Sequence, residues 1–529
     1  MNVPKTEDAR RKPGYTQTGK IRPASAMPEP EIISLPKYKT ISWACQNNGD
    51  MGTRNYLSLD ENARDLFVAS MRWAENHWDD TAGLLGDSGD AKLDARHHEI
   101  RGSVWYAFGL LMRNATDDVA RAVRVIDTVL NYQFDAPGRA FHGTFFRAPE
   151  EPYPPNDAVI WRDYDPNWRE FIITALALVL SEYADQLPAT LVKKIDAAIR
   201  KAVAGAQARG LSASYTNIAL MYAFMLCFAG NRFDNPTWFA EGERMALEVY
   251  RLFKPHDSFA EYNSPTYYGV DLYALALWRT YPALSPLLSQ LGSEMESSLW
   301  RDVAQFYHAD LRNLAGPYDR SYGMNMLDYI SVIGIWMRLA TDKYLAPFPN
   351  TDHPFEHEHD IGFVPLIAFL GAQIPDDALE HFRAFRGERY IEHVLADSPR
   401  RVATAWLGID RMIGAEFTSR TPPQSNQLHP GTIHWRIDAN HIGWIRLFYL
   451  EPVDARARKT VWRLRRRAKS HFSSTRPARA SIKLNVTVGD CRSCSCASRR
   501  LQKSFKSNRA EILSRFATAL TRINLSNVH

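Results

Sequence analysis

The sequence predicts an all-α fold of the (α/α)6 toroid type, a double helical barrel, followed by a short and incomplete antiparallel β segment. Helices that are apolar all round alternate with amphipathic ones, and short Pro- or Gly-marked turns join them. An inner ring of helices contacts protein on both sides, whereas an outer ring faces water. The sequence shows no repeat of fixed period, which argues against an α-solenoid.

One pair of neighbouring segments illustrates the alternation. Residues 191–203 carry a single apolar stripe with Lys and Arg opposite, as expected for a half-exposed outer helix. Residues 215–228 are apolar on every face, as expected for a buried inner helix. The same contrast recurs nearby. Residues 168–180 and 267–278 have the character of buried helices, whereas residues 238–253 are amphipathic.

The composition fits a soluble enzyme-sized chain of 529 residues, long enough for a barrel of this type as one domain. Aromatic residues reach 12%, with 14 Trp and 23 Tyr. Such rings either fill the layers between helices or line a groove, since Tyr and Trp combine a flat apolar face with a polar group. Both interpretations stay open at this stage.

The chain divides into four parts by composition. Residues 1–35 are expected to be a disordered lead-in, 36–418 the catalytic toroid, 419–454 the start of an antiparallel β domain, and 455–529 a disordered basic tail rich in Ser and Arg. The tail holds 19 Lys and Arg against two acidic residues, whereas acids outnumber bases before it. We expect the tail to lie outside the folded domain, as in translated non-coding or frame-shifted sequence. A basic arm that binds nucleic acid or an anionic membrane is the alternative.

Targeting and cofactor signals are missing from the sequence. The N-terminus has no apolar core for a secretory signal, no later run is long enough to cross a membrane, and only Cys45 and Cys227 lie in the body. A cytoplasmic protein is therefore expected, with no membrane or nucleic-acid partner and the oligomeric state open. Phosphate loops, dinucleotide fingerprints and nucleophile elbows are also missing, so we expect no cofactor.

The segment 256–278 is the first candidate for catalysis. Its polar loop contains Glu261 and Asn263 and passes through a Ser-Pro step, a good helix start, into a buried helix. Tyr267 and Tyr268 fall in the first turn of that helix, at the predicted barrel mouth. One of them is a candidate general acid or base beside a carboxamide that holds substrate. Alternatively, both only pack and satisfy loop carbonyls.

The segment 315–326 is the second candidate. Asp319, Arg320 and Tyr322 lie between two glycines just before an apolar helix. A neighbouring Arg lowers the pKa of a tyrosine by its charge, as a catalytic base requires. The alternative is a structural Asp–Arg pair that fixes the loop. Asn217 begins another apolar helix, where a buried amide needs either a core partner or a substrate.

Aromatic and imidazole groups complete the set of candidate substrate-binding residues. They are Trp161, Trp168, His98, His357 and His359. The last two belong to the run HPFEHEHD (353–360), which also offers His353 and Asp360 as metal ligands. The spacing matches no established ligand pattern, so we expect substrate hydrogen bonding or loop structure there, and no metal.

At these residues the chain resembles the heparinase- and alginate-lyase-like polysaccharide lyases, over roughly residues 40–450. The resemblance is one of architecture and of Asn, Tyr, His and Arg at the barrel mouth. It implies that Asn217 or Asn263 neutralises a uronate carboxylate and that Tyr267 or Tyr268 acts as base or acid.

The resemblance further implies that Arg320 and Tyr322 complete the site, and the expected function is β-elimination, or related acid–base chemistry, on a uronate-containing oligosaccharide. Two features depart from the family: the missing secretion signal, and Ile218 after Asn217 where alginate lyases commonly have His. Two alternatives remain. One is an intracellular isomerase, dehydratase or cyclase acting on a terpenoid or polyketide, similar to linalool dehydratase-isomerase. The other is a non-catalytic helical scaffold.

Overall fold

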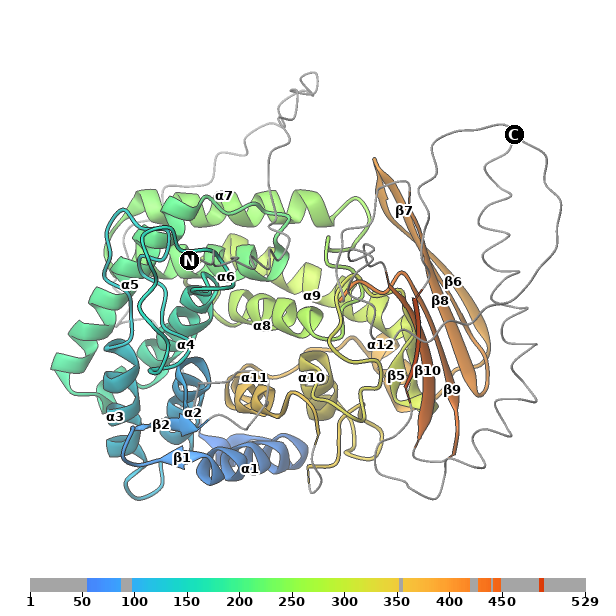
Figure 1. Ribbon diagram of the computed structural model, residues 1–529, viewed down its shortest axis with the longest axis horizontal. Coiled ribbons are helices and arrows are strands. Elements are labelled where there is room, and N and C mark those ends of the chain that lie inside the picture. The colour runs from blue at the N-terminus through green and yellow to red at the C-terminus, as the bar shows by residue number, and fades with distance from the viewer. Residues whose placement is uncertain are drawn as a thin grey trace, which may run out of the picture. The chain divides into compact units, whose positions relative to one another are not determined.

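A computed structural model describes residues 55–86, 98–351, 355–418, 427–438, 441–448 and, as backbone, 485–489. Expectations for residues 1–35, for His353 and for the rest of the basic tail fall outside the described residues. Within them, α-helices dominate up to residue 383 and strands follow (Figure 1). The predicted class, a mainly helical chain with antiparallel strands towards the C-terminus, is confirmed.

The helices come mostly in consecutive pairs. Their bounds are α1 Glu61–Asn76, α2 Ile100–Arg113, α3 Asp118–Leu130, α4 Trp168–Glu182, α5 Ala189–Arg209, α6 Thr216–Arg232, α7 Pro236–Phe253, α8 Tyr267–Thr280, α9 Pro286–Phe306, α10 Val332–Ala340, α11 Val364–Leu370 and α12 Asp376–Arg383.

The predicted alternation of buried and amphipathic helices is present. Nearly every residue of α2, α4, α6 and α8 is buried. Helices α3, α5, α7 and α9 each bury one stripe and leave the other face to solvent. Apolar residues on all faces require protein on all sides, so the first set packs between other elements.

The order of packing follows the chain. Helix α4 contacts both α2 and α6, α6 contacts α8, and α8 contacts α10 and α11. Helix α11 also packs against α2, so the contacts among the buried helices return to their starting point (Figure 1). The amphipathic helices pack on the buried ones, α3 on α2, α7 on α6 and α9 on α8.

Six antiparallel strands form the C-terminal sheet, in the order β11-β10-β9-β8-β7-β6 (Figure 1). Their bounds are β6 Arg389–Asp397, β7 Arg400–Leu407, β8 Arg411–Thr418, β9 Gly431–Arg436, β10 Ile442–Phe448 and β11 Asn485–Gly489. Short strands elsewhere form two small sheets: β1 Trp78–Asp79, β2 Leu84–Gly86, β3 His98–Glu99, β4 Tyr307–His308 and β5 Asn313–Leu314.

The sheet corrects two sequence-based boundaries. It begins at Arg389, about 30 residues before the expected position 419, and it has six strands where an incomplete unit was expected. In β6, Ile391, Val394 and Leu395 recur at i, i+3 and i+4, a spacing that also fits a helix. The backbone of β11 pairs with β10, so these five residues of the basic tail do join the sheet, contrary to expectation.

A loop that follows β5 is held against the sheet. The backbone of Gly316 approaches Gly414 of β8 so closely that a Cβ at position 414 would lie 1.8 Å from the Gly316 carbonyl oxygen. Thr432 of β9 accepts a hydrogen bond from the Gly316 N–H at 2.9 Å. Tyr318 forms a β-bridge with His429. These contacts fix the position of the loop that carries Arg320.

No helix in the described part of the chain is long and apolar enough to span a membrane.

Candidate functional site

Ser264 connects the two segments that the sequence singles out. Its hydroxyl accepts a hydrogen bond from the Tyr267 N–H at the start of α8, at 2.9 Å. It also donates to the carbonyl oxygen of Arg320, at 2.5 Å. Ser264 is fully buried, and both bonds are partly buried. The beginning of α8 and the Arg320 loop are therefore tied together by one side chain.

Arg320 is the centre of a cluster of polar side chains. Its guanidinium donates to Glu261 Oε1 at 2.5 Å, to the Tyr267 hydroxyl at 2.6 Å and to Gln427 Oε1 at 3.0 Å. The same group lies 3.9 Å from the centre of the Tyr267 ring. Charge, hydrogen bonding and ring contact thus fix the guanidinium plane. We call Arg320, Glu261, Tyr267, Tyr322 and Asn217 the Arg320 cluster.

Glu261 neutralises this arginine from inside the protein. Its second carboxylate oxygen accepts hydrogen bonds from Asn217 Nδ2 at 2.6 Å and from Thr216 Oγ1 at 3.3 Å. Asn217 therefore holds a carboxylate of the protein, whereas the resemblance to lyases implies a uronate carboxylate of the substrate. The hydrogen bond to Glu261 offsets the free-energy cost of burying the Asn217 amide in an apolar helix.

The hydroxyl groups of Tyr267 and Tyr322 are hydrogen-bonded at 2.6 Å. Tyr267 also accepts an N–H from Arg320, and in the bond between the two hydroxyls either tyrosine can be the donor. When Tyr267 donates to Tyr322, the Tyr322 proton is directed away from the cluster. Tyr322 is 38% exposed, so this end of the chain of hydrogen bonds reaches solvent.

The protonation of Tyr267 corrects the sequence-based argument. We expected a neighbouring Arg to lower the pKa of a tyrosine. Burial, the largest effect, raises the pKa of Tyr267 well above its ordinary value, Tyr322 adds to the rise, and the charge of Arg320 offsets only part of it. Tyr267 is therefore a phenol at neutral pH, which suits a proton donor rather than a base.

Two histidines adjoin the exposed end of the cluster. The His357 ring stacks on Tyr322 with centroids 4.8 Å apart, and it contacts the His359 ring at 5.7 Å. Asp360 follows directly, with an oxygen 3.7 Å from His359 Nε2. The structure thus brings the loop at 355–360 to the segments 256–268 and 315–325.

Three candidates in the same segments point elsewhere. The Tyr268 ring packs edge-on against Tyr262 and is fully buried. Asn263 donates to the carbonyl oxygens of Ala315 and Pro317, so it positions the loop. Asp319 pairs with Arg401 of β7 at 2.9 Å, which fixes the loop to the sheet.

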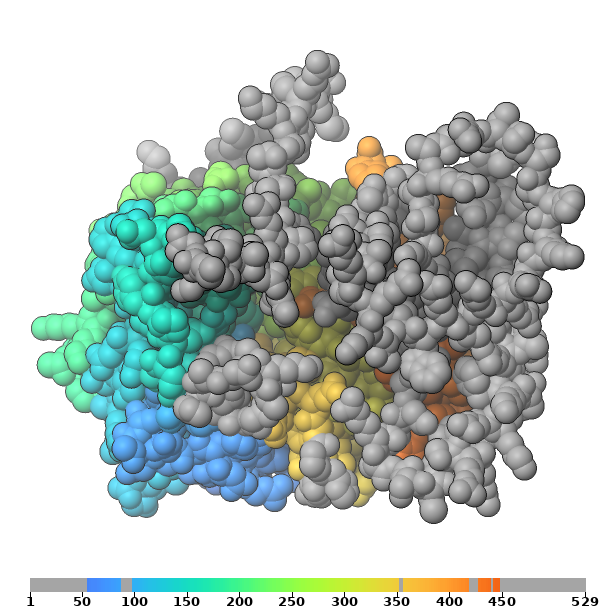
Figure 2. Space-filling model, viewed as in Figure 1, coloured from blue at the N-terminus to red at the C-terminus, as the bar shows by residue number. Residues whose placement is uncertain are grey.

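The remaining candidates make no described contact with the cluster. His98 bonds to Glu150 at 2.5 Å and to Asp79 at 3.2 Å. Trp168 is buried, and the Arg101 guanidinium lies 5.1 Å from the centre of its ring. Trp161 is half exposed on the loop between α3 and α4, which contributes to the cyan and teal surface in Figure 2.

Sequence reasoning missed a second layer around the cluster. Tyr215 accepts a hydrogen bond from Asn167 at 2.7 Å, and Arg209 donates to the same Asn167 at 2.8 Å. Burial raises the pKa of Tyr215 to about 12, and the charges of Glu261 and Arg320 act on it. Tyr215 directly precedes α6, whereas Tyr267 is the first residue of α8, and a tyrosine at the start of a buried helix was the available signal.

Asp271 was also missed. It lies one turn after Tyr267 on the same face of α8 and is fully buried, with Thr216 as its polar neighbour. Burial, with a smaller contribution from Glu261, raises the pKa of Asp271 well above its ordinary value. A lone acid in the apolar run YYGVDLYALALW was the signal in the sequence.

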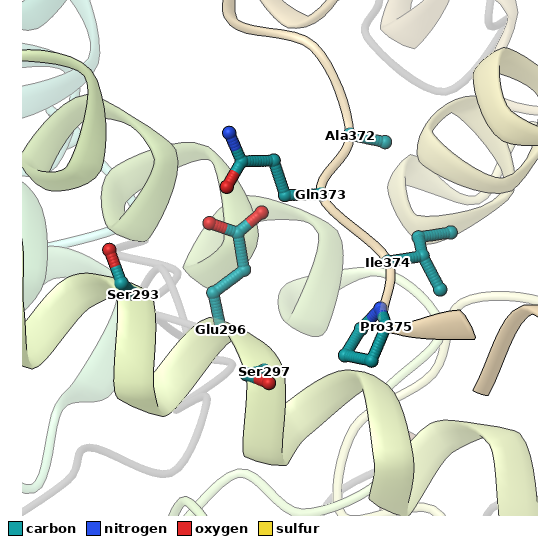
Figure 3. A pocket seen from close by; sticks show the side chains of 7 residues that line it. All are labelled: Ser293, Glu296, Ser297, Ala372, Gln373, Ile374 and Pro375. Atoms are coloured by element: carbon teal, nitrogen blue, oxygen red, sulfur yellow. The ribbon is translucent and has the colours of Figure 1, made fainter. Parts of the chain in front are cut away.

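A pocket of about 500 Å³ lies away from the cluster (Figure 3). It is lined by α9 and by the segment after α11, and the Glu296 side chain points towards Gln373. Glu296 is paired with Arg279 at the C-terminal end of α8. Tyr267 begins that helix, so about 20 Å of helix separates the pocket from the cluster. The pocket contains none of the predicted site residues.

No curated protein matches the chain. A family model described as "Domain of unknown function (DUF8769)" matches residues 64–372. This span covers more than half of the chain and contains every residue of the Arg320 cluster, whereas the sheet lies outside it. The chain therefore belongs to the DUF8769 family.

Proposed function

We propose that the protein is an acid–base enzyme of the lyase or isomerase type, in which Tyr322 delivers a proton to an oxygen of the substrate. The observation that carries the proposal is the chain of hydrogen bonds from Arg320 through Tyr267 to Tyr322. A charged donor whose side chain is 28% exposed lies at one end, a tyrosine that is 38% exposed lies at the other, and with Tyr267 as donor to Tyr322 the bonds form a path for a proton. Such positioned transfer contributes about 10²- to 10⁴-fold to a rate.

The proposed step balances without any other reagent. The departing oxygen takes the Tyr322 proton as its C–O bond breaks, the Tyr267 proton moves to Tyr322, and the transient phenolate on Tyr267 faces Arg320. The neighbouring carbon releases its proton as the double bond forms, and this proton returns to the tyrosine pair. The pair is unchanged after one turnover, and the substrate has lost water or an alcohol.

The charges in the cluster favour an uncharged substrate. Arg320 and Asn217, the groups expected to bind a uronate carboxylate, already hold Glu261. An external carboxylate has to displace Glu261 or lie beside it, at the cost of repulsion between like charges. An alcohol of the terpenoid or polyketide kind needs neither. The proposed activity is therefore the dehydration or isomerisation of such an alcohol.

Elimination from a uronate-containing oligosaccharide is the second candidate. It is supported by the same geometry, since Arg320 and Asn217 converge on one carboxylate and leave the Tyr267 hydroxyl beside it. A uronate that replaces Glu261 meets both a neutralising pair and a proton donor. In this case the Glu261 carboxylate competes with the substrate carboxylate for Arg320 and Asn217.

We also propose that the helices close into an α/α toroid with the Arg320 cluster at one mouth. The cyclic order of contacts from α2 through α4, α6, α8 and α11 back to α2 supports this arrangement. Each of Asn217, Tyr267 and Asp360 lies at or near the beginning of a buried helix. Parallel inner helices gather such positions at the same end of a barrel, which is also the architecture of the lyases that the sequence resembles.

A panel of two substrate classes tests the proposed function. Full-length protein is incubated with terpenoid alcohols, and products are followed by gas chromatography and mass spectrometry. In parallel, uronate oligosaccharides are followed by the absorbance of a new C4–C5 double bond. We expect turnover of an alcohol, abolished by Tyr322→Phe and retained by Tyr390→Phe, an exposed tyrosine on the sheet. Turnover of uronates alone selects the second candidate, and turnover that survives Tyr322→Phe overturns both.

A further inference from the structure

We propose that His357, His359 and Asp360 form a binding site for a divalent transition-metal ion of the zinc class. One candidate ligand atom from each of these residues lies within 4.8 Å of the others. Two imidazoles and one carboxylate are a donor set typical of Zn²⁺ sites with three protein ligands. The site goes beyond the proposed acid–base function and does not depend on it. It also differs from the expectation drawn from sequence, which was no metal.

Local backbone geometry brings the three ligands together. Residues Glu358–Phe363 form a 3-10 helix with His357 at its N-terminal cap, and the Asp360 N–H donates to the His357 carbonyl at 3.1 Å. His357 itself lies outside the helix in a left-handed conformation, and one of its ring nitrogens lies within 4.8 Å of an Asp360 carboxylate oxygen. His359 reaches the same point, with Nε2 3.7 Å from an Asp360 oxygen.

The backbone at His357 is held in an unusual conformation. Its φ of 55° lies in the left-handed region, which a residue other than glycine occupies at some cost. The preceding residue, Glu356, is fixed on both sides by backbone hydrogen bonds, with its N–H to Asp328 and its carbonyl to Ile330. The strained position of His357 is therefore set by the packed loop, as in preorganised ligand sites.

The distances suit closure around an ion. With metal–ligand bonds of about 2.0–2.2 Å, ligand atoms of a tetrahedral site lie about 3.4 Å apart. The observed spacing of up to 4.8 Å exceeds this by at most about 1.4 Å, which rotations about the side-chain bonds of the histidines can supply. Asp360 is mostly buried, whereas both histidines are partly exposed, so a cation enters from the solvent side.

The position of the site suggests its use. Three protein ligands leave a coordination position for water or for an oxygen of a substrate. Since His357 stacks on Tyr322, this open position is on the same part of the surface as the exposed end of the tyrosine pair. The chemical class of ligand is thus a divalent cation together with an oxygen donor.

Metal binding to the full-length chain tests the site. After treatment with a chelator, the protein is titrated with Zn²⁺ by calorimetry and with Co²⁺ by visible spectroscopy. The background variant carries Cys491→Ser, Cys494→Ser and Cys496→Ser, because thiols in the tail are competing ligands. We expect one equivalent to bind in this background, with the intense visible bands of four- or five-coordinate Co²⁺ and no thiolate charge-transfer band.

Ligand variants decide the assignment. His359→Gln and Asp360→Asn should each weaken Zn²⁺ binding by at least about 100-fold. Loss of a residue that only hydrogen-bonds to a metal ligand already weakens binding by up to about 100-fold, and loss of the ligand itself should weaken it at least as much. His441→Gln, at a histidine directly before β10, is the matched control and should bind as the parent does. Circular dichroism establishes that each variant is folded. Absence of Zn²⁺ binding to the parent, or binding that survives both ligand variants, overturns the proposal.

Discussion

The hydroxyl of Tyr267 on α8 lies 2.6 Å from that of Tyr322, in a loop 55 residues later, and Arg320 donates to the first of the two. Neither tyrosine is near the other in sequence. Ser264 and the sheet contacts of Gly316 and Tyr318 hold the two segments together. The cluster is therefore a product of tertiary structure, and its parts are separately testable.

Glu261→Gln tests the neutralisation of Arg320. The variant keeps the shape of the side chain but removes the charge that pairs with a largely buried guanidinium. We expect unfolding free energy to fall by about 2 kcal/mol, since hydrogen bonds to charged groups contribute 1.5–3 kcal/mol and a broken ion pair leaves a charge uncompensated. Urea unfolding measures the change. Glu392→Gln, at an exposed position of β6, should change it by less than about 0.5 kcal/mol. Equal effects in both variants contradict the prediction.

Ser264→Ala tests the link between α8 and the Arg320 loop. The substitution removes one hydrogen bond to each segment, and we expect a loss of about 1–2 kcal/mol in unfolding free energy. Ser285 caps the start of α9 in a comparable way, so Ser285→Ala should cost a similar amount. Turnover should fall only in Ser264→Ala, because only that change releases Arg320. An equal loss of turnover in both variants rejects the positioning role.

Asp271→Asn tests the protonation of the buried acid. A carboxyl whose pKa is raised in the folded state destabilises the fold as pH rises above its value in the unfolded chain, because the folded state then binds more protons. Asparagine has no such dependence. We therefore expect Asp271→Asn to melt at a higher temperature than the wild type at pH 7, with the difference shrinking towards pH 4. A lower melting temperature at pH 7 indicates an ionised, partnered Asp271 instead.

The imidazole of His393 joins β6 to α9 and gives a second pH dependence. Its ring nitrogens face Asp302 Oδ1 and the His256 carbonyl, both at 2.6 Å, and both contacts require N–H donors. Desolvation lowers the pKa of His393, but the hydrogen bond and charge of Asp302 outweigh it, so the net pKa is raised. Tyr262 and Asp257 also act on this network.

The sign of the His393 effect follows from linkage. A raised pKa in the folded state contributes stability that is fully present below the ordinary histidine pKa of about 6.5 and is lost as pH rises through the folded value. The melting-temperature difference between wild type and His393→Gln should therefore be larger at pH 5.5 than at pH 9. A difference that is constant with pH shows that the ring is neutral in the fold.

The helical part was predictable because burial leaves a pattern in each segment. Residues 215–228 have no polar face, and they form the buried helix α6. The sheet was harder, since β6 has a spacing of apolar residues that suits either a helix or a strand. That β6 forms a strand depends on its pairing with β7, and this pairing is a tertiary contact that the segment's own sequence does not encode.

The site was predictable as segments but not as contacts. Tyr267 and Tyr268 stood as equal candidates, yet successive residues of a helix point about 100° apart. One contacts Arg320, whereas the other packs against Tyr262. The rotation of α8 about its axis decides between them, and no local signal reports it. The partner of Arg320 was unpredictable for a similar reason, because Glu261 reaches it across 59 residues of chain.

Turnover by Tyr322→Phe is the most direct test of the proposed acid–base function. The measurement compares kcat of the wild type, Tyr322→Phe, Tyr267→Phe and the control Tyr390→Phe on the alcohol or uronate that the wild type converts. We predict that both cluster variants lose roughly 100-fold or more in kcat while the control retains it. Retention of kcat in Tyr322→Phe, with Tyr267→Phe also active, contradicts the proposed proton path.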